Sequence, residues 1–142
     1  MLPAHHRMRR GQDFTATVRK GVRAGTDRLV VHRRPTADED AVLVGFVVSK
    51  GVGGAVVRTR VKRRLRHLMS ERLASIERGT HVVVRALPRA AQATSAQLGA
   101  DLDRALRSTA RKLERRRPPA ASRGSESSAP RASAAPSPAT DG

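Results

Sequence analysis

The residues best suited to chemistry in this sequence are a cluster of cations near its middle. Six of the nine residues from Arg58 to Arg66 are lysine or arginine. The planar guanidinium of arginine can donate two hydrogen bonds to a pair of phosphate oxygens, and a row of arginines suits a sugar-phosphate backbone better than a single small anion. A solvated surface normally mixes charges of both signs, whereas no acidic residue follows here until Glu71. The cluster therefore predicts a surface that binds a nucleic-acid backbone.

Apolar residues interrupt these cations at helical spacing. At about 100° per residue the apolar positions fall within one arc, and the cations fall on the opposite side. Burial of the apolar side would hold the cations as a rigid surface, so we expect one long helix over about Ala55–Ile76. The apolar stripe contains Val57, Val61, Leu65, Leu68 and Ile76 beside the stem of Arg72, and the cationic face contains Arg60, Arg63 and Arg66, flanked by Lys62 and Arg64.

The sequence lacks the motifs that other kinds of chemistry require. The chain has no cysteine, which excludes disulfides, thiolate metal sites and cysteine catalysis. No HExxH motif or His/Asp cluster indicates a metal site, and the adjacent His5 and His6 suggest an incidental surface pair. The glycines of "SKGVGGA" lack the GK[ST] ending of a nucleotide-binding P-loop, although glycines between a strand and a helix let phosphate approach the backbone. We expect Asp101 and Asp103 to pair with Arg104, Arg107 or their neighbours.

The whole chain is strongly basic. Its 142 residues include 29 Lys and Arg against 12 Asp and Glu, a formal net charge of +17. A compact chain with this charge repels itself unless it binds a polyanion, of which nucleic acid is the commonest. The N-terminal segment lacks the apolar region of a secretory signal, and the longest apolar run, Ala41–Val48, is too short to span a bilayer. We therefore expect a cytoplasmic protein without a membrane partner.

Composition divides the chain into two regions. Residues 1–117 carry the periodic apolar patterns of one folded domain. Residues 118–142 contain no Val, Ile, Leu or Phe and are rich in Pro, Ser and Ala. Such a segment cannot bury enough apolar surface to offset its ordering entropy, so we predict a disordered tail.

The folded region predicts helices and strands in the order αβββαβα. The runs Arg28–Arg34 and Ala41–Ser49 are joined by the polar "PTADED" and predict a hairpin, with the second run as a central strand buried on both faces. A strand, the basic helix and a further strand in succession imply a parallel strand pair with the helix packed on the sheet. The remaining expected elements are a short helix Asp13–Lys20, a short strand Val22–Ala24, a strand Thr80–Ala86 and a long helix Ser95–Arg117.

Several segments resemble the protein subunit of bacterial ribonuclease P. The stretch "GFVVSKGVGGAVVRTRVKRRLR" is similar to the signature of that family, "MRRGQDFTATVRKG" to its basic lead-in and first helix, and "HVVVRALP" to its last strand. The likeness covers about residues 3–113. It implies an α+β fold, a small α/β sandwich of the ribosomal-protein-S5-domain-2-like type. It also implies a left-handed βαβ crossover around the basic helix, against the usual hand.

The resemblance also implies a function. The family is the basic partner of a catalytic RNA that removes 5′ leaders from precursor tRNA, an endoribonuclease activity whose chemistry the RNA and its bound Mg²⁺ carry. The implied partners are the RNA subunit and precursor tRNA, and no cofactor is bound by a motif in the protein. The implied RNA-binding residues are Lys50, Arg58, Arg60, Lys62, Arg63, Arg64 and Arg66 with the N-terminal Arg9 and Arg10, and the implied cleft for the single-stranded leader contains Phe14, Val18 and His32.

The chain departs from the family pattern where leader RNA is expected to stack. Val18 stands where a second cleft aromatic is common, and His32 stands where tyrosine is common. Since Phe14 and Phe46 are the only aromatic residues, we expect leader stacking to be weaker by about 1–3 kcal/mol per lost aromatic, unless His32 substitutes. The other departures are Gly51 for lysine, Gly54 and Thr59 for asparagine, and Leu87 for arginine.

The main alternative is a structural ribosomal-type or chaperone RNA-binding protein without a role in tRNA processing. Charge and the order of elements do not separate it from a ribonuclease P subunit, whereas the signature favours the latter. The alternative predicts association with ribosomes and no effect on precursor tRNA. A DNA-binding repressor is more remote, because no segment suggests a helix-turn-helix.

Overall fold

The computed structural model of the chain describes residues 2–36 and 42–116. Contacts divide the chain into two units, Met1–Ala110 and Arg111–Gly142. The first unit contains every strand and every site residue discussed below, and of the second the structure describes only the last residues of one helix. The predicted tail, residues 118–142, lies outside the described residues, and its disorder stays a prediction.

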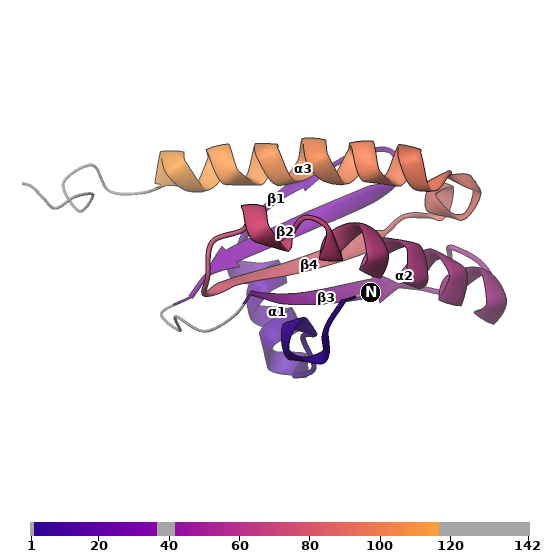
Figure 1. Cartoon of the computed structure of the whole chain (residues 1–142), viewed down its shortest axis with the longest axis horizontal. Coiled ribbons are helices and arrows are strands. Elements are labelled where there is room, and N and C mark those ends of the chain that lie inside the picture. The colour runs from indigo at the N-terminus through magenta and orange to yellow at the C-terminus, as the bar shows by residue number, and fades with distance from the viewer. Residues whose placement is uncertain (1, 37–41, 117–142) are drawn as a thin grey trace, which may run out of the picture. The chain divides into compact units, whose positions relative to one another are not determined.

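The described part of the chain contains the predicted elements in the predicted order (Figure 1). The helices are α1 (Gly11–Lys20), α2 (Ala55–Ser70) and α3 (Ser95–Arg116). The strands are β1 (Val22–Gly25), β2 (Leu29–Pro35), β3 (Leu43–Val48) and β4 (Thr80–Ala86). Short 3-10 helices occur at η1 (Ala4–His6), η2 (Leu73–Ser75) and η3 (Pro88–Gln92).

The four strands form one mixed sheet in the order β1-β2-β4-β3. β3 and β4 are parallel, as predicted, and α2 connects them. The predicted hairpin between β2 and β3 is wrong, because β4 lies between these strands and pairs antiparallel with β2. The predicted position of β3 at the centre of the sheet is also wrong, since β3 is an edge strand and β4 is central. The left hand expected for the crossover stays a prediction.

The apolar composition of β3 has a different cause from the one expected. α2 contacts this strand, and the N-terminal segment covers its outer edge, where the Met8 N–H donates to the Val44 carbonyl oxygen at 2.9 Å. The ring of Phe14 lies so close to Gly45 that a Cβ at this position would collide with it. An edge strand covered in this way has the same apolar pattern as a central one.

The main core lies between one face of the sheet and helices α2 and α3. Alternate residues of β4, Val82, Val84 and Ala86, join side chains of both helices in this core, among them the fully buried Leu98 and Leu102. Helix α1 contacts β2 and β4 and lies on the other side of the sheet from α3 (Figure 1). This helix of 10 residues is the main helical cover of the second face.

Helix α2 is shorter than the predicted Ala55–Ile76, because the side chain of Arg72 closes it. The Arg72 guanidinium donates to the carbonyl oxygen of Leu68 at 2.7 Å and to Asp103 Oδ1 on α3 at 2.7 Å. The hydrogen bond from Arg72 lowers the pKa of Asp103, and the charges of Arg72 and Arg107 lower it further. Asp103 therefore pairs with Arg72, while Asp101 pairs with Arg28 at 3.2 Å, in place of the ion pairs expected within α3.

Candidate nucleic-acid interface

The apolar positions that interrupt the cationic cluster are the buried side of α2. Val61 and Leu65 are fully buried, together with Met69, and Leu68 is nearly so. On the opposite side Arg60 and Arg63 are exposed. The sequence interpretation of α2 as a cationic face on an apolar anchor is therefore confirmed over the length of the helix.

The start of α2 is set by two glycines that act differently. A Cβ at Gly53 would lie 2.9 Å from the Val57 side chain, which is closer than a real side chain tolerates. Gly54 is the N-cap, makes no side-chain cap, and has open space where a Cβ would stand. Nothing in the structure explains why glycine replaces asparagine at position 54. Its consequence is a first helical turn whose N–H groups no N-cap side chain satisfies.

A hollow of about 410 Å³ runs along the cationic face of α2. No acidic residue lines it, and the Nε of Arg58 is buried there without a hydrogen-bond partner in the described part of the chain. A hollow lined by cations and by no carboxylate suits phosphate oxygens. The lining residues are Val48, Ala55, Arg58, Thr59, Lys62, Arg63 and Arg66.

A second hollow, of about 260 Å³, adjoins the first because Lys62 and Arg66 line both. It brings together the N-terminal segment, α1, the edge strand β3 and α2, and it contains both phenylalanines of the chain. Sequence reasoning did not place Arg7 and Phe46 here, since no local pattern reports that the N-terminal segment runs along β3. The lining residues are Arg7, Met8, Arg9, Phe14, Val44, Gly45, Phe46, Lys62 and Arg66.

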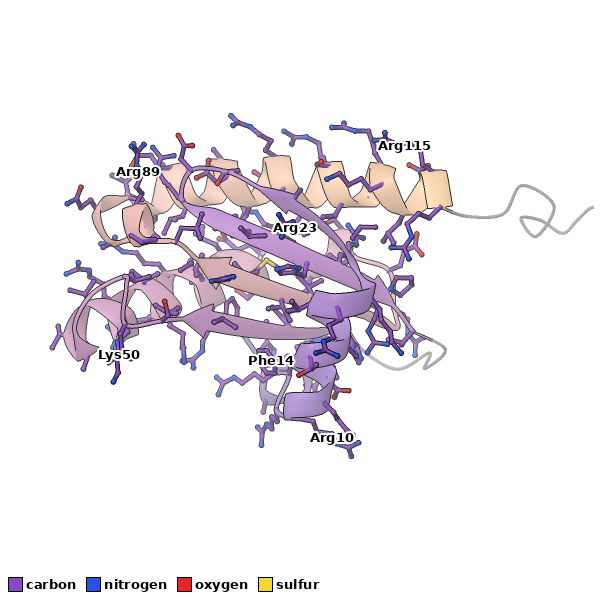
Figure 2. The ribbon with its side chains drawn as sticks, turned by 180° about the vertical axis from the view of Figure 1, so that it is seen from behind. Arg10, Phe14, Arg23, Lys50, Arg89 and Arg115 are labelled. Carbon is purple, nitrogen blue, oxygen red and sulfur yellow. The ribbon has the colours of Figure 1, made fainter. Side chains whose placement is uncertain are left out.

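The other predicted cations lie around these two hollows. Lys50 follows β3 and is exposed, and Arg10 is exposed at the N-cap of α1 (Figure 2). Neither lines either hollow. Arg64 instead donates to the carbonyl oxygen of Ala93 at 2.8 Å, which ties α2 to the segment before α3. Arg60 makes a longer and exposed bond to the neighbouring carbonyl oxygen of Ala91, at 3.4 Å. The predicted RNA-binding set therefore contains two arginines that hydrogen-bond this segment.

Because of its hydrogen bond, we expect Arg64 to contribute to the stability of the fold, whereas its neighbour Arg63 should not. Arg64→Ala should lower the free energy of unfolding by about 1 kcal/mol, because the Ala93 carbonyl loses its donor. Arg63→Ala should leave stability unchanged, since Arg63 is exposed. Urea unfolding of the two variants measures both effects, and equal stability of the two would show that the Arg64 bond contributes nothing.

The residues predicted for the leader cleft do not form one aromatic surface. Phe14 stands over Gly45, and Val18 is 45% exposed on α1. His32 is only 4% exposed beneath that helix, and its Nδ1 and the Oγ1 of the buried Thr17 have no partner in the described part of the chain. The idea that His32 replaces a lost stacking residue is therefore wrong, because its ring presents no open face.

Burial of His32 makes stability depend on pH. Burial lowers the pKa of His32, and the charges of Arg23 and Arg85 lower it further. The unfolded chain therefore binds a proton that the folded chain does not, and stability should fall as the pH drops through about 6.5 towards the lowered pKa. Urea unfolding across this range should show the fall in the wild type and a smaller one in His32→Gln. A fall of equal size in both proteins would assign it to other groups.

The described residues show neither a metal cluster nor a membrane span. Within 2–36 and 42–116, no group of three or more His, Asp or Glu side chains could hold a metal ion. Among the same residues, no helix is long and apolar enough to cross a bilayer.

Comparison with known proteins places this geometry in a family. Residues 2–110 match the model of the ribonuclease P family, described as "Ribonuclease P". The ribonuclease P protein component of Streptomyces griseus is 56% identical over 115 residues, which cover 75% of this chain and 93% of that protein. That of Beutenbergia cavernae is 57% identical over 108 residues, covering 76% and 91%.

Solved structures agree with the sequence relatives. The RNase P protein of Staphylococcus aureus superposes with a TM-score of 0.66 at 26% identity, over 72% of this chain and 93% of that one. The fold of the Thermotoga maritima protein also matches, with a TM-score of 0.61 at 22% identity, over 74% and 96%. The expected α+β fold is confirmed, and the chain belongs to the ribonuclease P protein family.

Proposed function

We propose that this chain is the RNA-binding subunit of a ribonuclease P, which assists a catalytic RNA in removing the 5′ leader from precursor tRNA. The observation that carries the proposal is the hollow on α2, where four cations and no acid line one surface held by a buried apolar stripe. The buried stripe fixes the backbone of α2, so the helix itself needs no ordering when phosphates bind to its cations. Family membership favours it over a ribosomal-type or chaperone protein.

Two RNA partners fit two parts of the surface. The cationic face of α2 would bind the folded RNA subunit through its backbone. The hollow lined by Phe14, Phe46 and the N-terminal arginines would face precursor tRNA, because it combines cations with the chain's two aromatic rings. Both assignments rest on charge complementarity and on the continuity of the two hollows through Lys62 and Arg66.

In this proposal the RNA subunit carries out the hydrolysis of the phosphodiester bond, and the RNA also binds the Mg²⁺ ions. The residues of this chain would bind, orient and neutralise phosphates, which lowers the repulsion between the RNA subunit and its substrate. A cytoplasmic site of action stays a prediction.

Reconstitution tests the proposed function. The full chain would be mixed with a bacterial ribonuclease P RNA and a precursor tRNA at low magnesium concentration. We expect 5′-leader removal with both components and none with the protein alone. A chain that leaves cleavage by the RNA unchanged and sediments with ribosomes would support the structural alternative.

A further inference from the structure

The end of α2 is joined to α3 by one arginine whose three side-chain nitrogens all donate within the protein. Arg72 Nε and Nη2 donate to the two carboxylate oxygens of Asp103 on α3, at 2.7 and 3.3 Å. Its Nη1 donates to the Leu68 carbonyl oxygen of α2 at 2.7 Å, and Nη2 also reaches the Gly99 carbonyl oxygen of α3 at 3.5 Å. The Arg72 side chain is only 19% exposed. Arg72 therefore differs from the exposed arginines of α2, because its donors are directed at protein acceptors.

The two helices approach each other closely at this link. A Cβ at the buried Gly99 would lie 3.1 Å from Arg72 Nη2 and 3.4 Å from Leu68 Cδ2. The first distance is shorter than a real side chain normally makes, so glycine at this position lets the backbone of α3 lie against the link. The hydrogen bond from Arg72 also lowers the pKa of Asp103, and the carboxylate is therefore ionised at neutral pH.

This link supplies a directional constraint that apolar packing does not. The buried stripe of α2 turns one side of the helix to the core, but hydrophobic burial has no direction of its own. A guanidinium fork on a carboxylate, in contrast, requires one geometry. The cations of α2 stand about 6 Å from the helix axis, so a rotation of about 10° would move them by about 1 Å. Such a shift takes a hydrogen bond to phosphate out of its favourable range.

We propose that Arg72 and Asp103 are positioning residues for RNA binding, whose ion pair sets the rotation of α2 at which Arg60, Arg63 and Arg66 meet the backbone of the RNA subunit. This inference rests on the proposed function. The pair itself binds no phosphate, because its donors and acceptors are used within the protein. Leu68, to which Arg72 bonds, follows Arg63 by five residues, about 8 Å along the axis, so the pair acts on RNA through the helix.

Removing Asp103 separates positioning from charge, because the two predict opposite changes. Asp103→Ala makes the chain more basic, and alanine favours a helix more than aspartate does, so charge alone would tighten RNA binding. Loss of the link predicts weaker binding. Asp27→Ala is the matched control. Asp27 is an exposed acid in the turn before β2 that pairs with Arg89 at 3.7 Å, so its removal adds the same charge and frees an arginine in the same way.

The test titrates each full-length chain with a bacterial ribonuclease P RNA over a range of salt concentrations, below the unfolding transition of every variant. Asp103→Ala should weaken binding about fivefold and Arg72→Gln about tenfold, and the double variant should lose no more than Arg72→Gln, because both changes break one link. Asp27→Ala should bind at least as tightly as the wild type. Arg78→Gln, which removes the same charge from an exposed position in the turn before β4, should bind within about threefold of the wild type.

A tethered cleavage reagent reports the placement of α2 on the RNA. The chain has no cysteine, so Val56→Cys, at an 80% exposed position in the first turn of α2, takes an iron–EDTA group at one place only. Hydroxyl radicals released there should cut the RNA at one set of nucleotides in the otherwise wild-type chain. With Arg72→Gln the cuts should shift or spread. A loss of stability alone would leave them in place, because only the folded chain presents the cationic face.

Three results would overturn the proposal. The first is Asp103→Ala binding as tightly as Asp27→Ala, and the second is an unchanged pattern of cuts with Arg72→Gln. The third is a salt slope lower by about 0.9 in Arg72→Gln alone, which would mean that Arg72 itself contacts a phosphate. Any of them with normal cleavage by the wild-type holoenzyme leaves the proposed function intact, whereas a wild-type chain that neither binds the RNA nor promotes cleavage overturns the proposed function itself.

Discussion

Changing Arg60 and Arg63 together to alanine should weaken binding of the RNA subunit about 100-fold at constant salt, because two hydrogen-bonded phosphate contacts are lost. The plot of log affinity against log salt concentration should become shallower by about two, since two fewer counterions are released. Both arginines are exposed on α2. The bond from Arg60 to the Ala91 carbonyl oxygen is exposed and long, at 3.4 Å, so the variant should keep nearly the thermal stability of the wild type. Filter binding at several salt concentrations measures the first two effects, and thermal unfolding the third.

A double variant with the same loss of charge provides the control. Arg78 and Arg104 are exposed and lie away from α2, so Arg78→Ala/Arg104→Ala should change affinity only through the net charge of the protein. If both double variants lost affinity equally, the total charge would explain binding and the face of α2 would have no special part. A loss of thermal stability in Arg60→Ala/Arg63→Ala without weaker binding would mean that these residues belong to the folded core.

Changing Leu65 to alanine should lower the free energy of unfolding by about 2–4 kcal/mol. Leu65 is fully buried in the main core, on the side of α2 opposite the exposed arginines. Its removal leaves a cavity that the packed strands and helices fill only in part. For a domain of this size the midpoint of thermal unfolding should fall by roughly 10–25 °C.

Val56 on the same helix is the matched control for Leu65. It is 80% exposed, so Val56→Ala should change the free energy of unfolding by less than about 0.5 kcal/mol. Urea unfolding of both variants measures the difference. Below its unfolding transition, Leu65→Ala should bind RNA with an unchanged salt slope, because its cations remain. A stable Leu65→Ala would contradict the anchoring of the cationic face by this stripe.

Local sequence patterns were sufficient to predict most helices and strands of this protein. The 3.6-residue period of Val61, Leu65 and Leu68 identified both sides of α2, because side-chain direction along a helix depends only on neighbouring residues. The strand runs and the parallel β3–β4 pair followed from alternation and from the helix between them. The family signature around the cations identified the function, and the comparisons confirmed the family over residues 2–110.

Errors arose wherever distant segments decide the structure. The apolar run of β3 suggested a central strand, but its cover comes from the N-terminal segment and Phe14, which no local pattern places there. The end of α2 depends on the contact of Arg72 with α3, some 30 residues further along the chain. Helix periodicity indicates which residues share a face. It does not indicate which other element packs against that face.

The sequence by itself determined the charge of the protein, the composition of its cationic face and its family. Only the tertiary structure decided which cations remain available for RNA, because Arg64 is bonded to the Ala93 carbonyl while Arg63 faces a hollow. It also buried His32 under α1 and left Arg85 exposed in the central strand. The physical reason is that burial is a property of the assembled sheet and helices. Residues with similar sequence patterns therefore differ in function once the fold covers one and exposes another.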